Sequence, residues 1–347
     1  MVDSIIPLGE SRVTVLMPVY NAEEYLPESI ESILNQTYSN FTFLIIDDGS
    51  TDNSNEVIQK YSSDPRIEVI SLSDNHGLVY CLNLGLDRIK TEFIVRMDAD
   101  DVSHTERIEV QVKLMETNPN LQVIGSKVIG YDVAFPKLEE LKLELTDQRK
   151  INSIAFLNCP IAHPTVIMRR DFLVLKSLKY DLDYKHAEDN ALWLDVISEG
   201  NISEIQYPFL KYRHHLNQVS NLENRIQELN SAKKRAQLIF KLTSINFSDT
   251  ELAKYRYLSY KHDTLMLSDF ENFSAFVVKF RESVLNQTEI QIDKYFFIKL
   301  LYQRVSLLYL RNSKIGTVLL WNYLRNFGMD LNIFIFPRLL RRVIHGL

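Results

Sequence analysis

A regular alternation of short apolar runs and amphipathic stretches over residues 13–125 constrains the fold most. Runs rich in β-branched and aromatic residues predict strands at 13–17, 41–46, 67–72, 93–97 and 121–125. Helical spacing of apolar residues begins at residue 23 and recurs at 53–61, 78–89 and 103–117. Strands that alternate with such helices form βαβ units. An α/β fold with a mostly parallel sheet and flanking helices is therefore predicted.

The pattern changes along the second half of the chain. Less regular elements come first: helices at 148–157 and 186–199, and strands at 165–168, 202–205 and 209–212. Only helical patterns follow, at 223–242, 249–260, 270–285, 291–311, 315–325 and 331–344. This change divides the chain into an α/β domain, residues 1–220, and an α-helical region, residues 221–347.

The charge distribution argues against one class of partner and favours another. The net charge of −6 argues against nucleic-acid binding, which needs a basic surface. Residues 295–347 nevertheless carry eight Lys or Arg against one acid. Within them, the aromatic and basic segment 334–342 resembles segments that lie on anionic lipid. A packed helical region with a solvated basic face is the alternative.

Compartment signals point to the cytoplasm. Cys81 and Cys159 lack ligand spacing, which predicts free thiols in a reducing compartment. The N-terminus shows no signal-peptide pattern, and no apolar stretch reaches the roughly 18 residues of a membrane span. We expect a cytoplasmic protein that can lie peripherally on the inner face of the cytoplasmic membrane.

Asp98, Asp100 and Asp101 directly follow the predicted strand 93–97. Ligands of open α/β sheets bind beyond the carboxyl ends of strands. Carboxylates packed this closely repel one another unless a cation holds them, and Mg²⁺ and Mn²⁺ prefer oxygen ligands. The sequence predicts a metal site for a phosphorylated ligand, with Asp98 and Asp100 on one side. The alternative is an acidic loop in which Asp101 or Ser103 caps the next helix.

Asp48 ends the neighbouring strand and belongs to the same edge of the sheet. Its carboxylate can accept a hydrogen bond from a ring N–H of a bound base. Asp-Gly is equally a common turn pair, in which Asp52 or Asn53 would cap the next helix. Tyr20 and Asn21 follow the first strand, where a tyrosine can stack on a base or simply pack.

Two further groups have both a chemical and a structural interpretation. Glu188 and Asp189 open a predicted helix, where acids favour the helix dipole, but one of them can also serve as a general base. His214 and His215 end a strand. Adjacent strand residues point to opposite faces, so at most one of these histidines faces a site.

Taken together, these residues resemble glycosyltransferase family 2, the inverting nucleotide-sugar transferases of the GT-A fold. The resemblance covers roughly residues 12–221 and is closest to bacterial enzymes that build lipooligosaccharide, O-antigen or capsule, including β-1,3-N-acetylglucosaminyltransferases. The matching strings, in family order, are VLMPVYNAEEYL, SILNQTY, IIDDGSTD, NHGLVYCLNLGL, MDADD, RIEVQV, HPTVIMRR, AEDNALWL and LKYRHHLNQVS. One departure is His104-Thr105, where relatives often carry an apolar residue and proline.

The resemblance implies a role for each matching residue. Asp48 would pair with uracil and Tyr20 would pack against it. Asp100 would touch Mn²⁺ or Mg²⁺ directly, with Asp98 as its D-x-D partner and His215 near the metal or diphosphate. The remaining expected donor-binding residues are Pro18, Asn21 and Asn75. Asp189 would be the catalytic base, and the acceptor or donor-sugar side would include His163, Glu188 and Trp193.

The implied activity is transfer of one sugar from a UDP-sugar to a hydroxyl of a cell-surface glycan or lipid-linked acceptor. GlcNAc or GalNAc is favoured as the sugar, followed by Gal. Processive relatives carry a Q-x-x-R-W motif and membrane spans, which this sequence lacks, so addition of a single sugar is expected. The alternative is a catalytically inactive relative that binds nucleotide sugar or scaffolds a polysaccharide assembly complex.

Overall fold

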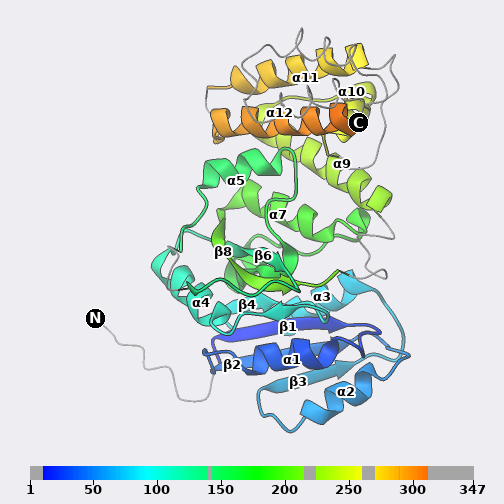
Figure 1. Cartoon of the computed structure of the whole chain (residues 1–347), viewed down its shortest axis with the longest axis vertical. Coiled ribbons are helices and arrows are strands. Elements are labelled where there is room, and N and C mark those ends of the chain that lie inside the picture. Colours follow the sequence, from blue (N-terminus) through cyan, green and yellow to red (C-terminus); the bar gives the residue numbers. More distant parts are fainter. Residues whose placement is uncertain (1–10, 139–142, 215–223, 260–269, 289, 312–347) are drawn as a thin grey trace. The chain divides into compact units, whose positions relative to one another are not determined.

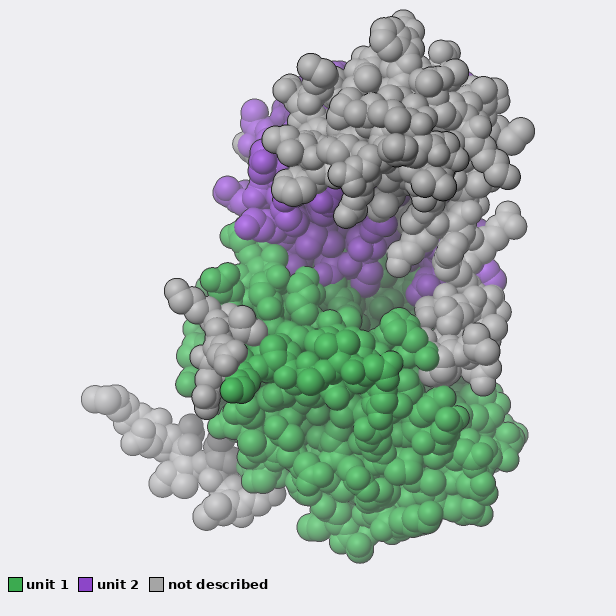
Figure 2. All heavy atoms as spheres, in the orientation of Figure 1, with its two compact units in different colours: residues 1–147, 161–222 green, residues 148–160, 223–347 purple. Residues whose placement is uncertain are grey.

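The computed structural model describes residues 11–138, 143–214, 224–259, 270–288 and 290–311 (Figure 1). The chain forms two compact units, coloured separately in Figure 2. The first comprises residues 1–147 and 161–222, and the second comprises residues 148–160 and 223–347.

The first unit contains one eight-stranded sheet in the order β3-β2-β1-β4-β7-β6-β8-β5. Its strands are β1 Val13–Val19, β2 Phe41–Asp47, β3 Ile67–Ser71, β4 Phe93–Arg96, β5 Val102–Ser103, β6 Val123–Gly130, β7 Ile167–Arg169 and β8 Ile202–Tyr212. Neighbours from β3 to β4 pair in parallel, as do β6 and β8, whereas the pairs β4–β7, β7–β6 and β8–β5 are antiparallel. The predicted α/β class with a mostly parallel sheet is confirmed.

Helices cover both faces of the parallel part of this sheet. The helices that follow its strands are α1 Leu26–Leu34, α2 Ser54–Tyr61, α3 Leu78–Arg88 and α4 Arg107–Thr117. Apolar residues of α1, α2 and α4 pack with Val13, Val15 and Met17 in one core cluster. On the opposite face, α3 lies against Leu16 so closely that a Cβ on Gly85 would approach Leu16 Cδ1 to 2.5 Å. This layering leaves the carboxyl ends of β1, β2 and β4 at one edge, where ligands of such sheets bind.

Three predicted element boundaries were wrong for local reasons. The two strands predicted at 202–205 and 209–212 form the single strand β8, whose register against β6 shifts where Lys127 faces Pro208. Proline has no N–H to donate, which explains the irregularity and the apparent break in the pattern. The strand predicted from Thr165 begins at Ile167, because His163–Thr165 form a 3₁₀ turn. The helix predicted from Ser103 begins at Arg107, after β5.

The second unit is helical, as predicted. Its helices are α5 Gln148–Ala155, α9 Asn224–Thr243, α10 Asp249–Ser259, α11 Phe270–Leu285 and α12 Lys294–Arg311. A cluster of aromatic rings packs within it, formed by Phe247, Tyr255, Phe276, Phe280 and Phe297. The helices predicted at 315–325 and 331–344, and the basic segment 334–342, lie outside the described residues. Within the described part of the chain, no helix is long and apolar enough to cross a membrane.

Helix α5 belongs to this helical unit, although the sequence suggested placing residues 148–160 in the α/β domain. The Asn152 amide donates to Gln291 O at 2.6 Å, and Ser153 Oγ accepts from Asp293 N at 3.1 Å. These partners are about 140 residues away in sequence, so no local pattern reveals them.

Candidate active site

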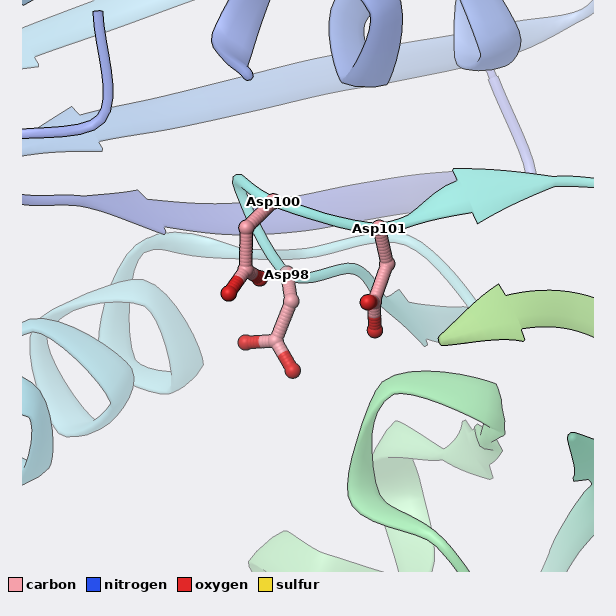
Figure 3. A group of neighbouring side chains, drawn as sticks. All are labelled: Asp98, Asp100 and Asp101. Carbon is pink, nitrogen blue, oxygen red and sulfur yellow. The ribbon is translucent and has the colours of Figure 1, made fainter. Parts of the chain in front are cut away.

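The acidic loop after β4 brings three carboxylates together. One oxygen from each of Asp98, Asp100 and Asp101 lies within 4.8 Å of the others, and Figure 3 shows the side chains extending from one side of the loop. The loop turns at Ala99 and Asp100, so the convergence comes from the turn and not from strand alternation. Burial, then the charges of Asp98 and Asp100, raise the pKa of Asp101 to about 8. Asp101 Oδ2 is also buried without a hydrogen-bond partner.

This donor set fits a divalent cation. It is made of oxygen atoms only, which suits Mg²⁺ or Mn²⁺. Asp98 and Asp100 are the expected ligands, and one carboxylate oxygen of Asp101 lies within 4.8 Å of theirs. The alternative in which Asp101 or Ser103 caps helix α4 is wrong. The N-cap residue of α4 is Glu106, and the N–H of Glu106 donates to His104 Nδ1 at 3.2 Å.

Helix α1 holds the main chain of the acidic loop. The Ser29 hydroxyl lies 2.8 Å from Ala99 O and 2.7 Å from Asp101 O, and donates to both. One turn on, Ser32 Oγ accepts from Ser103 N at 3.1 Å. Just beyond the helix, the Gln36 amide donates to His104 O at 2.8 Å. Ser29 and Ser32 are three residues apart and share one face of α1, and Gln36 follows just after the helix ends. The loop is thereby fixed without regular secondary structure.

His104 gains a structural explanation from its surroundings. Its ring packs edge to face against Phe135, Tyr207 and Phe209, with ring centroids 4.8 to 5.7 Å apart. Burial lowers the pKa of His104, so its ring is neutral and can accept the Glu106 N–H. His104 stands at the position where relatives often carry an apolar residue, and its ring both packs among aromatic side chains and accepts the N–H of Glu106, the residue before α4.

Arg96 is a buried cation beside the acidic loop, and sequence reasoning gave it no role. In β4, Val95 faces the core cluster of α1, α2 and α4, so Arg96 points to the opposite face. Its side chain is 2% exposed and forms an ion pair with Asp98. A charged residue inside the apolar run 93–97 was the available signal, because a buried charge requires a partner.

Glu188 and Asp189 begin helix α7, Glu188–Glu199. The N-cap position is Ala187, and no side chain caps the helix there, but both acids lie in the first turn, where the helix dipole favours them. Burial, followed by the charge of Asp189, raises the pKa of Glu188 to about 7. Burial also raises the pKa of Asp189, while the Asn190 N–H at 2.6 Å and the charge of Arg96 oppose that rise. The result is an ionisable Asp189 more basic than an exposed aspartate, which suits proton abstraction.

Replacing Glu188 by Gln is expected to remove a pH-dependent loss of stability. The folded pKa of about 7 lies above the ordinary 4.5, so this group's stabilisation is complete below pH 4.5 and is lost as the pH rises through 7. The difference between the folded and the ordinary pKa of Glu188 corresponds to about 3 kcal/mol of unfolding free energy. Urea unfolding in EDTA at pH 5 and pH 8 measures it. Wild type should lose more stability than the variant between these values.

The control is Glu199→Gln, which changes a glutamate at the far end of the same helix, where it pairs with Lys176 at 3.2 Å. This variant should follow the wild-type pH dependence. Equal losses for wild type and Glu188→Gln would show that Glu188 does not ionise in this pH range.

His163 and Trp193, both expected on the acceptor or donor-sugar side, are buried in the structure. His163 Nε2 and Tyr180 Oη are 2.8 Å apart, and burial lowers the pKa of His163 well below 6.5, so this histidine is neutral. Trp193 is fully buried and packs edge-on against His163. A fully buried ring cannot offer its face to a sugar, so the structure does not support the acceptor contact expected for Trp193.

The two residues expected to contact the uracil ring, Asp48 and Tyr20, lie in different environments. Both Asp48 oxygens accept main-chain N–H groups, from His76 and Gly77, each at 2.8 Å. These bonds join Asp48 to the loop before α3 and not to its own turn, and the predicted contact with uracil remains a prediction. Tyr20 is 48% exposed, so its ring does not pack in the interior and is available for stacking.

Asn21 ties two loops of this edge together. With φ of 48°, it accepts from Thr51 N through Oδ1 at 2.8 Å and donates its own N–H to Ser50 Oγ at 3.0 Å. Pro18 is buried within β1, Asn75 is exposed before α3, and His215 lies outside the described residues. The donor roles expected for these residues stay predictions.

Comparison with known proteins places these features in a family. The sequence profile described as glycosyl transferase family 2 matches residues 14–176. An uncharacterized glycosyltransferase of Haemophilus influenzae is 32% identical over 300 residues, covering 84% of this chain and 89% of its own. The Escherichia coli UDP-Glc:alpha-D-GlcNAc-diphosphoundecaprenol beta-1,3-glucosyltransferase WfgD is 31% identical over 229 residues, covering 64% of this chain and 84% of its own.

Solved structures share the fold. The structure of S. aureus TarS 1-349 in complex with UDP-GlcNAc superposes with a TM-score of 0.59 at 16% identity, covering 88% of this chain and 93% of that one. The mannosyltransferase PcManGT from Pyrobaculum calidifontis, in complex with GDP-Man and Mn²⁺, gives a TM-score of 0.52 at 16% identity, covering 94% and 89%. Identities this low show the GT-A-like fold alone.

Proposed function

Because the chain belongs to glycosyltransferase family 2, we propose that it transfers a single sugar from a UDP-sugar to an acceptor hydroxyl with inversion at the anomeric carbon. The observation that carries this proposal is the convergence of the Asp98, Asp100 and Asp101 carboxylates at the carboxyl end of a parallel strand. The charges of Arg96 and Asp98 act on Asp189, so the base and the acidic loop belong to one electrostatic site.

Asp189 acts as the general base in the proposed mechanism. Its carboxylate takes the proton of the acceptor hydroxyl, whose oxygen forms the new bond to the anomeric carbon. The bond from that carbon to the diphosphate oxygen breaks on the opposite side, and the electron pair leaves with UDP. A Mn²⁺ or Mg²⁺ ion held by Asp98 and Asp100 would supply Lewis-acid stabilisation of the leaving diphosphate. One carboxylate suffices, because UDP leaves without the protonation that a glycosidase must provide.

The nucleotide would lie across the ends of β1 and β2. The exposed ring of Tyr20 is suited to stacking on uracil, and Asp48 holds the turn beneath it. Asn21 fixes the distance between the two loops through its bonds to Ser50 and Thr51. These contacts support a preformed nucleotide pocket at the switch point of the sheet.

The proposed acceptor is a lipid-linked glycan and the proposed donor a UDP-hexose. The E. coli relative acts on a diphosphoundecaprenol-linked GlcNAc with UDP-Glc. Our sequence-based expectation favours GlcNAc or GalNAc, then Gal, for the transferred sugar. We propose that a membrane-bound acceptor of this kind is met at the inner face of the cytoplasmic membrane.

Removing the metal or its main ligand is expected to abolish donor turnover. Wild type is screened for UDP release from UDP-GlcNAc, UDP-GalNAc, UDP-Gal and UDP-Glc, with Mn²⁺, with Mg²⁺ and with EDTA. One donor should be hydrolysed in a metal-dependent way, and Asp100→Asn should lower that rate by about 10²-fold or more, because several kcal/mol of charge stabilisation is lost.

The matched control is Asp132→Asn, which alters an exposed aspartate of the same unit. Its rate should equal that of wild type. UDP release that is unaffected by EDTA and by Asp100→Asn would contradict a metal-dependent enzyme. No release from any donor, with an added acceptor present, would favour the inactive binding or scaffold alternative.

A further inference from the structure

Arg213, at the end of β8, contacts two consecutive residues of the acidic loop. Its main-chain N–H donates to Asp101 Oδ1 at 3.0 Å, and its Nε donates to Asp100 O at 2.8 Å. One bond therefore orients the Asp101 carboxylate and the other fixes the peptide that follows Asp100. The family motif gave no role to this arginine.

The guanidinium of Arg213 is itself held in a fixed orientation. It lies over the Tyr131 ring, 3.7 Å from the centroid, and over the Tyr25 ring at 4.7 Å. Its Nη2 pairs with Glu28 Oε2 at 2.5 Å. Tyr131 Oη donates to the same Glu28 carboxylate at 2.9 Å. Arginine is suited to this site, because its planar group can stack on rings while donating along two edges.

The acidic loop is thus clamped from two directions. Helix α1 holds Ala99 and Asp101 through Ser29 on one side, and Arg213 holds the loop from the end of β8. Without the Arg213 side chain, the Asp100 carbonyl loses its hydrogen-bond donor. The rings of Tyr25 and Tyr131 also lose the guanidinium that packs on them. The carboxylates would then sample positions that no longer converge on one ion.

We propose that Arg213 is a positioning residue that presents Asp100 and Asp101 to the divalent cation, so that cation affinity depends on how the end of β8 is anchored. This inference rests on the proposed metal-dependent function. Partners that orient metal ligands typically change metal affinity by about 10- to 100-fold when they are removed.

The experiment is a Mn²⁺ titration of the full chain, followed by electron paramagnetic resonance of the free ion, with and without UDP. Arg213→Ala should raise the Mn²⁺ dissociation constant about 10- to 100-fold, and Arg213→Lys should fall between it and wild type. The control is Arg12→Ala. Arg12 also bridges two carboxylates, Glu92 and Glu116, but lies at the opposite end of β4 from the acidic loop. The Arg12→Ala variant should therefore bind Mn²⁺ with the wild-type dissociation constant.

A second readout separates positioning from general damage. Saturating Mn²⁺ should restore most of the UDP release of Arg213→Ala, because the defect lies in metal binding. If Arg213→Ala does not fold, Glu28→Gln, which leaves the arginine in place but removes its ion pair, should weaken Mn²⁺ binding in the same direction.

Two outcomes would overturn the inference. A folded Arg213→Ala that binds Mn²⁺ within about twofold of wild type would show that the arginine does not position the ligands. A rate defect in Arg213→Ala that saturating Mn²⁺ does not relieve would assign the arginine a role outside metal binding. With either of these results, the proposed function still stands if the wild-type protein releases UDP from a UDP-sugar. Wild type that neither binds Mn²⁺ nor releases UDP would reject both proposals.

Discussion

Asp189→Asn is expected to lower sugar transfer by about 10²- to 10⁴-fold while leaving Mn²⁺ affinity and the melting temperature close to wild type. The amide has the shape of the carboxylate but cannot accept the acceptor's proton. Burial raises the pKa of Asp189, so the wild-type group is a stronger base than an exposed aspartate. Initial rates of product formation at saturating donor and acceptor measure the effect.

Asp195→Asn is the matched control, since it changes an aspartate on the same helix α7. It should transfer sugar at the wild-type rate. The pH dependence adds a further check. Transfer by wild type should fall as acid protonates Asp189, with the midpoint above the ordinary aspartate pKa of 3.8. Equal transfer rates for wild type and Asp189→Asn would remove this residue as the base.

Arg96→Met should lower the free energy of unfolding by about 3–5 kcal/mol in the absence of metal. Methionine fills the space of the buried arginine but leaves Asp98, whose side chain is 30% exposed, without its ion-pair partner beside the buried Asp101. The charge of Arg96 also lowers the pKa of Asp189, so its loss makes ionisation of that group more costly. The deficit should be smallest in acid, where the carboxyls are protonated, and should grow as the pH rises.

Urea unfolding in EDTA from pH 5 to pH 8 measures this deficit, and Mn²⁺ should recover part of it by replacing the missing positive charge. Arg12→Met provides the control, because Arg12 pairs with Glu92 and Glu116 in partly exposed positions. Such pairs contribute about 1 kcal/mol or less. A stability of Arg96→Met equal to wild type at pH 8 would show that Arg96 does not compensate the buried acids.

Features set by local sequence could be predicted well. The strands β1, β2 and β4 are mainly apolar runs with a proline or aspartate at, or within two residues of, the carboxyl end, so their presence and their approximate ends were visible. That visibility is enough to bring Asp48 and Asp98 to one edge, because parallel strands share it. The acidic residues after β4 could therefore be placed at this edge without any knowledge of distances, whereas the role of the E-D pair came from the family resemblance and stays a prediction.

Features set by distant contacts could not be predicted. The place of α5 in the helical unit depends on Gln291 and Asp293, far along the chain. The contribution of Arg213 depends on a strand end meeting the acidic loop more than 110 residues earlier. Trp193 shows how a matching motif leaves packing out: it was expected on the acceptor or donor-sugar side, and the structure buries it fully.

Because the acidic loop is hydrogen-bonded to α1, the D-x-D pair alone is a poor candidate for grafting into another protein. Its main-chain groups at Ala99, Asp101 and Ser103 are satisfied by the hydroxyls of Ser29 and Ser32. A designer who grafted D-A-D-D onto the end of another strand would import the negative charges without these partners. The portable unit is the loop together with the S-x-x-S-x-x-x-Q segment, which comprises Ser29 and Ser32 of α1 and Gln36 just after it. Searches for related sites in unfamiliar sequences should require both segments.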